Sequence, residues 1–152
     1  MTGKRKVSSG TAWEPIVGYS RAVAAGDYIF VSGCTSVAGA DFVHPGDACA
    51  QTAQAIANVR TALESLGAGL ADVVRTRMFV TDISRWEEYG RAHGAAFATA
   101  LPATSMVEVR SLIDPRMLVE VEAVAYLPGI GAATGEPAAA AGAEPQRGEG
   151  AS

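Results

Sequence analysis

Three segments of the sequence carry pairs of charged residues two positions apart among apolar ones, and this alternation limits the folds open to the chain. The segments are residues 72–82, 101–111 and 117–126. A period of two is typical of β-strands, because successive side chains of a strand point to opposite faces of a sheet. We therefore expect a sheet with one largely apolar face and one face that mixes apolar and charged side chains.

If the alternation holds throughout, the mixed face contains three arginines, three glutamates and five apolar residues. They are Arg75, Arg77, Glu108, Arg110, Glu120 and Glu122, with Val73, Phe79, Met106, Leu118 and Val124. Such a face is too apolar to leave in water and too charged for an ordinary core. Further copies of the chain would cover it, with the charges paired between subunits or lining a cleft. The alternative is a solvated face with scattered apolar residues, which is common in antiparallel sheets.

Two helices are expected between the strands. From Asp47 onward, apolar residues recur at helical spacing, and Gly67 follows where a left-handed residue often ends a helix. The second helix has Ser84 and Glu87 at the spacing of a capping box. The apolar positions are Ile56, Val59, Leu63 and Leu66 in the first helix, and Trp86, Tyr89, His93 and Phe97 in the second.

A strand over residues 28–33 is expected to pair with an upstream strand through a turn at Gly26 and Asp27. The order of elements is then β-β-α-β-α-β-β. Strands and helices in this arrangement predict an α+β domain, with a mixed sheet and two helices packed on one face.

The 152 residues fit one domain, which we place over residues 11–127. Residues 1–10 contain a basic run and are expected to form a flexible arm. Residues 128–152 are mostly Gly, Ala, Pro and Glu, so they bury too little apolar surface to offset the entropy of ordering and are expected to be disordered.

Composition also argues against several classes of protein. The net charge is −4 and the basic run is confined to the first ten residues, so we expect no binding of nucleic acid. No run of about 18 apolar residues predicts a membrane span, and no secretory signal is recognised, so a cytoplasmic protein is expected. Cys34 and Cys49 lack CxxC spacing and are expected to be reduced thiols, with no metal site.

Five segments occur in an order that is familiar: "GYSRAV", "YIFVSG", "DVVRTRMFVTDI", "PATSMVEV" and "VEVEAVAY". With the expected helices between them, they resemble the RidA/YjgF family, which also carries the label endoribonuclease L-PSP. The resemblance covers about residues 16–127. It implies a chorismate-mutase-like fold and a homotrimer whose sheets form a central barrel, with three ligand clefts between subunits.

The resemblance also implies a reaction. The catalytic branch of the family hydrolyses enamine and imine acids, such as 2-aminoacrylate, to 2-oxo acids and ammonia, and it uses no cofactor. A guanidinium suits the substrate carboxylate because its planar fork donates two parallel hydrogen bonds. A glutamate can then position the attacking water and accept its proton.

Carried over to this sequence, the cleft tyrosine of the family matches Tyr19, its strand-end serine matches Ser32, and its water-handling glutamate matches Glu120. The essential arginine is not matched. The family pattern P-A-R-S-C-V-E-V has Thr104 here in place of the arginine and Met106 in place of the cysteine. Loss of such a buried charged contact typically costs about 2–5 kcal/mol, so the ordinary activity of the family is expected to be weak or absent.

Three other arginines are candidates to replace the missing guanidinium. Arg21 comes first because it lies two residues after Tyr19, and Arg75 and Arg77 on the expected mixed face follow. Each also has a purely structural interpretation, since Arg75 and Arg77 would pair with glutamates between subunits. Tyr19, Ser32 and Glu120 would likewise serve as packing, turn and ion-pair residues.

Three functions remain open at this point. The leading one is a homotrimer that binds a small carboxylate or carbonyl metabolite at intersubunit clefts, with hydrolysis of imines or enamines as its reaction if it is an enzyme. The second is a non-catalytic regulatory trimer that senses a metabolite, which Thr104 favours. Ribonuclease activity ranks third, because the domain is acidic and offers no catalytic grouping of histidine and lysine.

Overall fold

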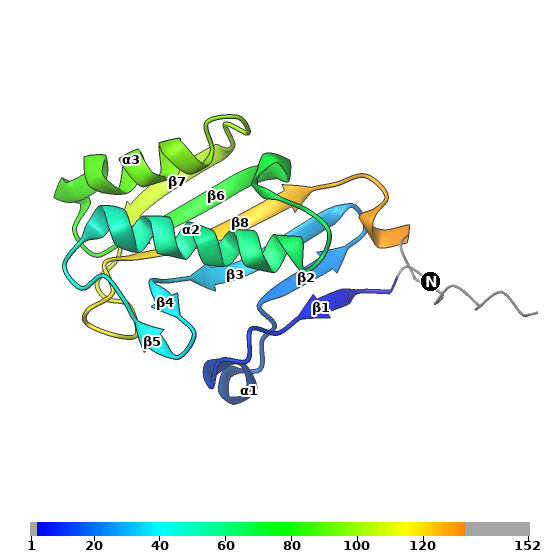
Figure 1. The fold of residues 1–152 in the computed structure, drawn as a ribbon, viewed down its shortest axis with the longest axis horizontal. Helices are drawn as coiled ribbons and strands as arrows, with labels where there is room; N and C mark the ends of the chain where they lie inside the picture. Colours follow the sequence, from blue (N-terminus) through cyan, green and yellow to red (C-terminus); the bar gives the residue numbers. More distant parts are fainter. Residues whose placement is uncertain (1–2, 133–152) are drawn as a thin grey trace, which may run out of the picture.

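The computed structural model describes residues 3–132 and contains a six-stranded mixed sheet with the two longest helices on one face (Figure 1). The strands lie in the order β1-β2-β3-β8-β6-β7. β6 and β7 are parallel, and the other neighbouring pairs are antiparallel. The α+β class and the placement of both helices on one face confirm the prediction from the sequence.

The elements follow the expected order, with several short ones added. The main sheet contains β1 (Arg5–Val7), β2 (Ala22–Ala25), β3 (Tyr28–Cys34), β6 (Val73–Val80), β7 (Ala103–Glu108) and β8 (Val119–Tyr126). A separate ribbon pairs β4 (Val37–Ala38) with β5 (Asp41–Phe42). The helices are α1 (Trp13–Val17), α2 (Ala48–Glu64) and α3 (Trp86–Ala96), and the 3-10 turns are η1 (Leu70–Asp72), η2 (Ile83–Arg85) and η3 (Ile130–Ala132).

The core lies between α2, α3 and the face of the sheet that they cover. Alternate residues of β8 point into it, and the apolar stripe of α2 packs against them. The fully buried members include Val119, Val121 and Ala125 from β8 and Ile56, Val59 and Leu63 from α2. Burial of these side chains supplies the main driving force for docking both helices on the sheet.

The ends of α2 agree with the sequence pattern. The Asp47 carboxylate accepts a hydrogen bond from Ala50 N at 2.8 Å, as an N-cap residue does. After the helix, Gly67 has φ +90°, and Ala68 N donates to Leu63 O at 3.0 Å. A residue with a Cβ is disfavoured at that φ, so glycine is required where the chain turns back toward the sheet.

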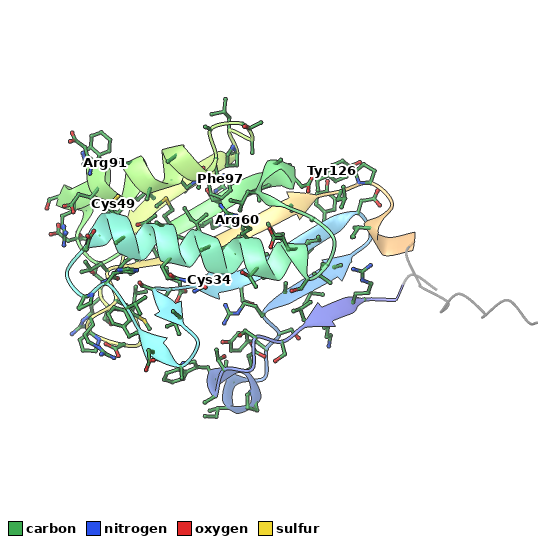
Figure 2. The ribbon with its side chains drawn as sticks, in the orientation of Figure 1. Cys34, Cys49, Arg60, Arg91, Phe97 and Tyr126 are labelled. Carbon is green, nitrogen blue, oxygen red and sulfur yellow. The ribbon has the colours of Figure 1, made fainter. Side chains whose placement is uncertain are left out.

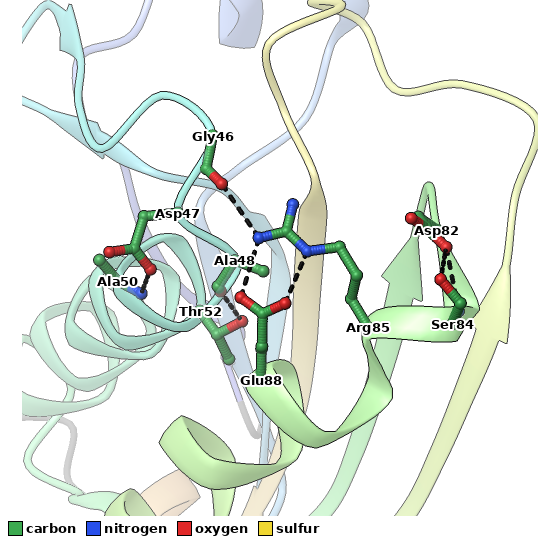
Figure 3. Close-up of polar contacts among 9 residues, drawn as sticks. All are labelled: Gly46, Asp47, Ala48, Ala50, Thr52, Asp82, Ser84, Arg85 and Glu88. Carbon is green, nitrogen blue, oxygen red and sulfur yellow. Dashed lines mark hydrogen bonds and ion pairs between the residues drawn. The ribbon is translucent and has the colours of Figure 1, made fainter.

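The start of α3 differs from the expected capping box. The N-cap residue of α3 is Arg85, and no side chain caps the helix. Asp82 instead caps the preceding turn η2: its carboxylate accepts hydrogen bonds from the backbone N and the hydroxyl of Ser84 (Figure 3). The 3-10 turn η2 precedes the helix and moves its first residue past Ser84. Arg85 then donates to the carboxylate of Glu88 and to Gly46 O, and so holds this turn against the loop before α2 (Figure 3).

The apolar stripe of α3 is shorter than expected. Tyr89 and Phe97 are buried and His93 is half-buried, but Trp86 is 57% exposed. Trp86 is the first residue of the helix, where it lies beyond the edge of the core. Its expected place in the core is therefore wrong.

The expected flexible arm is partly wrong. Arg5–Val7 form β1, which pairs with Ala22–Ala24 of β2, and the Arg5 guanidinium donates to Leu66 O at 2.8 Å. Basic side chains are compatible with an edge strand because the pairing uses backbone groups. Residues 128–132 also belong to the folded part, since Ile130 in η3 is only 7% exposed and packs in the core. The rest of the expected tail, residues 133–152, lies outside the described residues.

The expected mixed face is confirmed on β8 and needs correction on both neighbours. Glu120, Glu122 and Val124 lie on the face without helices. In β6, a bulge between Val73 and Arg75 turns Val73 into the core.

In β7, the pairing of Thr76 with Thr104 and of Met78 with Met106 puts Thr104, Met106 and Glu108 on the helix side. β7 is an edge strand whose helix side is only partly covered, so polar residues are tolerated there and charge alone misassigned its faces. Arg110 and Leu118 lie outside the strands.

Within residues 3–132, every helix is too short or too polar to cross a lipid bilayer.

Candidate functional site

A cavity of about 580 Å³ lies where β3 ends and four parts of the chain meet. Its walls come from residues 7–21 with α1, from the chain after Ser32, from one face of α2, and from the loop before β8. Among the candidate site residues proposed from the sequence, the cavity contains Tyr19, Arg21 and Glu120. This cavity is the candidate functional site.

Arg21 organises the polar end of the cavity. Its Nη1 donates to Gly33 O at 2.5 Å and to Ser32 O at 3.3 Å, and its Nη2 donates to the Tyr19 hydroxyl at 3.0 Å. Nε donates to Ser9 Oγ at 3.4 Å. These contacts use four of the five N–H groups of the guanidinium, which leaves one N–H on Nη2 for a ligand.

The positive charge of Arg21 is available to a ligand. Within residues 3–132, no carboxylate lies within salt-bridge distance of this guanidinium. The guanidinium also lies 5.4 Å from the centre of the Tyr19 ring, within cation–π range. An anion that enters the cavity therefore meets an ordered arginine whose charge no acidic side chain neutralises directly.

Glu120 is a half-buried carboxylate in the same cavity. Within the described residues it receives no hydrogen bond that would fix its ionised form. Burial and, secondarily, the nearby charge of Glu122 raise its pKa above the ordinary value, and Arg21 offsets part of this rise. A carboxyl group with a raised pKa is suited to exchange protons with a substrate.

Gly33 makes room for Glu120. A Cβ atom at this position would overlap the Glu120 carboxyl group, so any side chain here would displace it. Gly33 also provides the carbonyl that Arg21 holds most closely. The sequence alone did not single out Gly33, because the approach of β8 to it depends on strand pairing.

Ser32 does not line the cavity with its hydroxyl. Its Oγ donates to Ser20 O at 2.8 Å, and only its backbone contacts Arg21: the carbonyl accepts from Nη1, and the N–H donates to Arg21 O at 2.9 Å. In this structure the side chain of Ser32 joins β3 to the segment before β2.

Glu14 is a further acidic residue, which sequence reasoning missed. It is only 6% exposed, and its carboxylate accepts hydrogen bonds from Ser8 Oγ, Ser9 N and Ser9 Oγ. Burial alone would raise the pKa of Glu14, but these bonds, helped by the charge of Arg21, lower it below the ordinary value. Glu14 thus orders the stretch that forms one cavity wall. The sequence does carry a signal for Glu14, because an acidic residue follows Trp13 in an otherwise largely apolar segment.

Cys34 lines the cavity from the end of β3, under α2, whereas Cys49 lies in the first turn of α2 (Figure 2). Burial raises the pKa of the Cys34 thiol, an effect that the charge of Arg21 only partly offsets. The thiol is therefore protonated near neutral pH and is a poor nucleophile.

Thr104 and Met106 lie away from this cavity in the same chain. The strands β8 and β6 separate their strand, β7, from β3. Thr104 Oγ1 lies 2.8 Å from Thr76 Oγ1, which lies 2.8 Å from His93 Nε2, and Met106 packs against the core. Burial lowers the pKa of His93, which favours its neutral form. Within one chain, Thr104 and Met106 cannot act together with Arg21 and Glu120.

Arg75 and Arg77 are also outside the cavity. Arg75 Nη2 donates to Ser105 Oγ at 3.0 Å, and Arg77 forms an exposed salt bridge with Glu122 at 3.2 Å. Of the three candidate replacements for the missing arginine, only Arg21 lies in the cavity.

Within residues 3–132, no three His, Cys, Asp or Glu side chains are grouped so that they could hold a metal ion.

Comparison with known proteins finds a matching family model and similar solved structures. The family model described as Endoribonuclease L-PSP matches residues 9–127. The chain belongs to the RidA/YjgF family. A member of the YjgF/YER057c/UK114 family from Mycobacterium tuberculosis has a crystal structure that is similar with a TM-score of 0.76 and 50% identity, over 82% of this chain and 100% of that one. The YjgF gene product of E. coli is similar with a TM-score of 0.67 and 29% identity, over 80% and 91% of the two chains.

Curated relatives in the RidA/YjgF family include proteins with and without a described activity. An uncharacterized protein of Streptomyces coelicolor is 38% identical over 122 residues, which are 80% of this chain and 91% of that protein. The 3-aminoacrylate deaminase RutC of Acinetobacter baylyi is 30% identical over 114 residues, or 74% and 90% of the two chains.

Proposed function

We propose that this protein is a deaminase that hydrolyses 2-imino acids, or their enamine tautomers, to 2-oxo acids and ammonia. The observation that carries the proposal is the grouping of Arg21, Tyr19 and Glu120 in one cavity. The similarity to a 3-aminoacrylate deaminase, whose named substrate is an enamine acid, supports the same class of reaction.

Arg21 binds the substrate carboxylate in this proposal. The remaining N–H of Nη2 donates to one carboxylate oxygen, and the Tyr19 hydroxyl, which already accepts from Nη2, donates to the substrate. Because the other four N–H groups hold backbone and side-chain oxygens, the guanidinium is fixed before the substrate arrives. Because the guanidinium is already fixed, less side-chain conformational entropy is lost when the substrate binds.

Glu120 acts as the general base for the attacking water and then as the general acid for the leaving amine. Its carboxylate accepts a proton from a water molecule while the water oxygen forms a bond to the imine carbon, and the imine nitrogen takes up a proton from solvent. The resulting carbinolamine then loses ammonia: Glu120 returns its proton to the amine, the C–N bond breaks, and the remaining hydroxyl becomes the 2-oxo group as its proton leaves to solvent. The oxygen of water thus replaces the imine nitrogen on the carbon, and no oxidant or reductant is needed.

A homotrimer completes the proposal. The face of the sheet opposite the helices exposes several large apolar side chains together with charged ones. The exposed fractions are 46% for Tyr28, 49% for Phe30, 46% for Val107 and 41% for Tyr126. Contact with neighbouring copies would bury this surface. It would also allow β7 of one subunit, with Thr104, to approach the cavity of the next.

The test measures ammonia release from imino acids generated freshly from several amino acids. The proposal predicts release faster than in buffer, and loss of about 10²-fold or more in rate for Glu120→Gln, which cannot accept the proton. Glu87→Gln is the matched control, because Glu87 lies in the first turn of α3 outside the cavity. Ammonia release equal to buffer for every imino acid would remove the proposal.

The second candidate is a non-catalytic trimer that binds a metabolite. Thr104 favours it, because a neutral hydroxyl in place of the family's arginine weakens carboxylate binding on that side of a shared cleft. Calorimetry with 2-oxo acids separates the two functions: saturable binding without any turnover supports the second, whereas ammonia release that depends on Glu120 excludes it.

A further inference from the structure

We propose that the cavity selects ligands with a bulky, uncharged apolar side chain over the smallest 2-imino and 2-oxo acids. This inference rests on the proposed function for the position of the carboxylate, and it extends that function to the class of substrate.

The size of the cavity is the first observation. Its volume of about 580 Å³ lies within the range of roughly 300–1,000 Å³ that encloses drug-sized ligands. An imino acid with only a methyl side chain would fill a small part of this space. The unfilled part would hold water or would be available to a larger side chain.

The apolar wall is the second observation. Trp13 and Val17 of α1 and Ile113 of the loop before β8 line the cavity, although they are 46%, 67% and 64% exposed. Val7, Val37 and Met117 extend this wall. Contact between these exposed apolar side chains and an apolar ligand removes apolar surface from water, which favours binding of the ligand.

The charge distribution is the third observation. The charged residues that line the cavity are Arg21 and Glu120, both assigned to the reacting end of the substrate. No further acidic or basic side chain among the lining residues is left to pair with a charged substrate side chain. A charged side chain packed against these apolar walls would lose part of its hydration without gaining a partner, so charged side chains are disfavoured.

One face of α2 determines the width of the cavity. Asn58, Thr61, Ala62 and Ser65 line it at spacings of three, four and seven residues, which places them on the same side of the helix. All four are small or medium in size. Thr61 and Ser65 are exposed, so a larger residue at either position would narrow the cavity without disturbing the core.

The experiment compares the binding of 2-oxo acids with methyl, isobutyl and benzyl side chains by calorimetry, and the hydrolysis of the corresponding imino acids. At about fourfold in affinity for each buried methylene, the isobutyl compound should bind at least about 10-fold more tightly than the methyl compound. Equal or tighter binding of the methyl compound would overturn the inference. Because binding is measured apart from turnover, absence of ammonia release would count against the proposed deaminase alone.

A cavity variant gives an independent readout. Thr61→Leu should lower the affinity for the benzyl compound by about 10-fold or more and change the affinity for the methyl compound by less than twofold. Arg60→Leu is the matched control, since Arg60 lies next to Thr61 on α2, is exposed and does not line the cavity (Figure 2). An unchanged ratio of affinities in Thr61→Leu would contradict the assignment of this face of α2 to the side-chain pocket.

Discussion

Gly33 is the residue on which the position of Glu120 depends most directly. Adding one methyl group by Gly33→Ala would overlap the Glu120 carboxyl group, so either that side chain or the end of β3 must move. We expect a fall of about 10-fold or more in kcat/KM, because catalytic carboxylates tolerate little displacement. Steady-state assays of ammonia release provide the measurement.

Gly90→Ala is the control for this substitution. Gly90 lies within α3, and a Cβ there meets nothing within 4 Å. Alanine should stabilise the helix by about 0.5–1 kcal/mol and leave activity unchanged. Full activity in both variants would show that Glu120 does not require the space above Gly33.

Glu122 influences the titration of Glu120 from the same face of β8. Its negative charge contributes to the raised pKa of Glu120, so Glu122→Gln should lower that pKa. If Glu120 acts as a base, activity is lost as pH falls through its pKa, and the acidic limb of kcat/KM against pH should move to lower pH in the variant. A shift to higher pH would contradict this role.

At the scale of elements, the cap of η2, the turn that leads into α3, provides a stability test. Asp82→Ala removes the acceptor for Ser84 N and should cost about 0.5–2 kcal/mol in the free energy of unfolding. Glu87→Ala should change it by less than about 0.5 kcal/mol, because α3 has no side-chain cap and Ser84 and Glu87 form no capping box. Urea denaturation of both variants measures the difference, and a larger loss for Glu87→Ala would restore the capping box.

The long elements could be predicted from the sequence because their signals are local. The apolar stripe of α2 and the alternation in β8 each follow from the period of one element, and both are confirmed. The faces of β6 and β7 could not be predicted in the same way. The bulge beside Val73 and the parallel pairing of Thr104 with Thr76 arise from contacts between strands, which the sequence of one strand does not contain.

The candidate site was predictable only in part for the same reason. Tyr19 and Glu120 were singled out through family resemblance and Arg21 through its place beside Tyr19, and the structure brings all three into one cavity. Glu14 and Gly33 were missed because their importance depends on partners that folding brings close, namely Ser9 and Glu120.

At the scale of the whole molecule, the uncovered face of the sheet predicts assembly. With a mass of 15.6 kDa per chain, light scattering should report the mass of about three chains at micromolar concentration. Phe30→Asp, which puts a charge at a position 49% exposed in the single chain, should shift the protein toward monomers. A folded wild-type monomer at that concentration would contradict the homotrimer.

In the proposed function, Arg21 binds the substrate carboxylate and Glu120 lies beside the reacting carbon, both in one cavity. A crystal structure of the protein with 4-methyl-2-oxopentanoate tests it most directly. We predict that the carboxylate lies within about 3 Å of Arg21 Nη2, that the 2-oxo carbon lies beside the Glu120 carboxyl group, and that the isobutyl group points toward Trp13 and Ile113. A ligand bound elsewhere, with its carboxylate held by Arg75 or Arg77 and this cavity empty, would contradict the account.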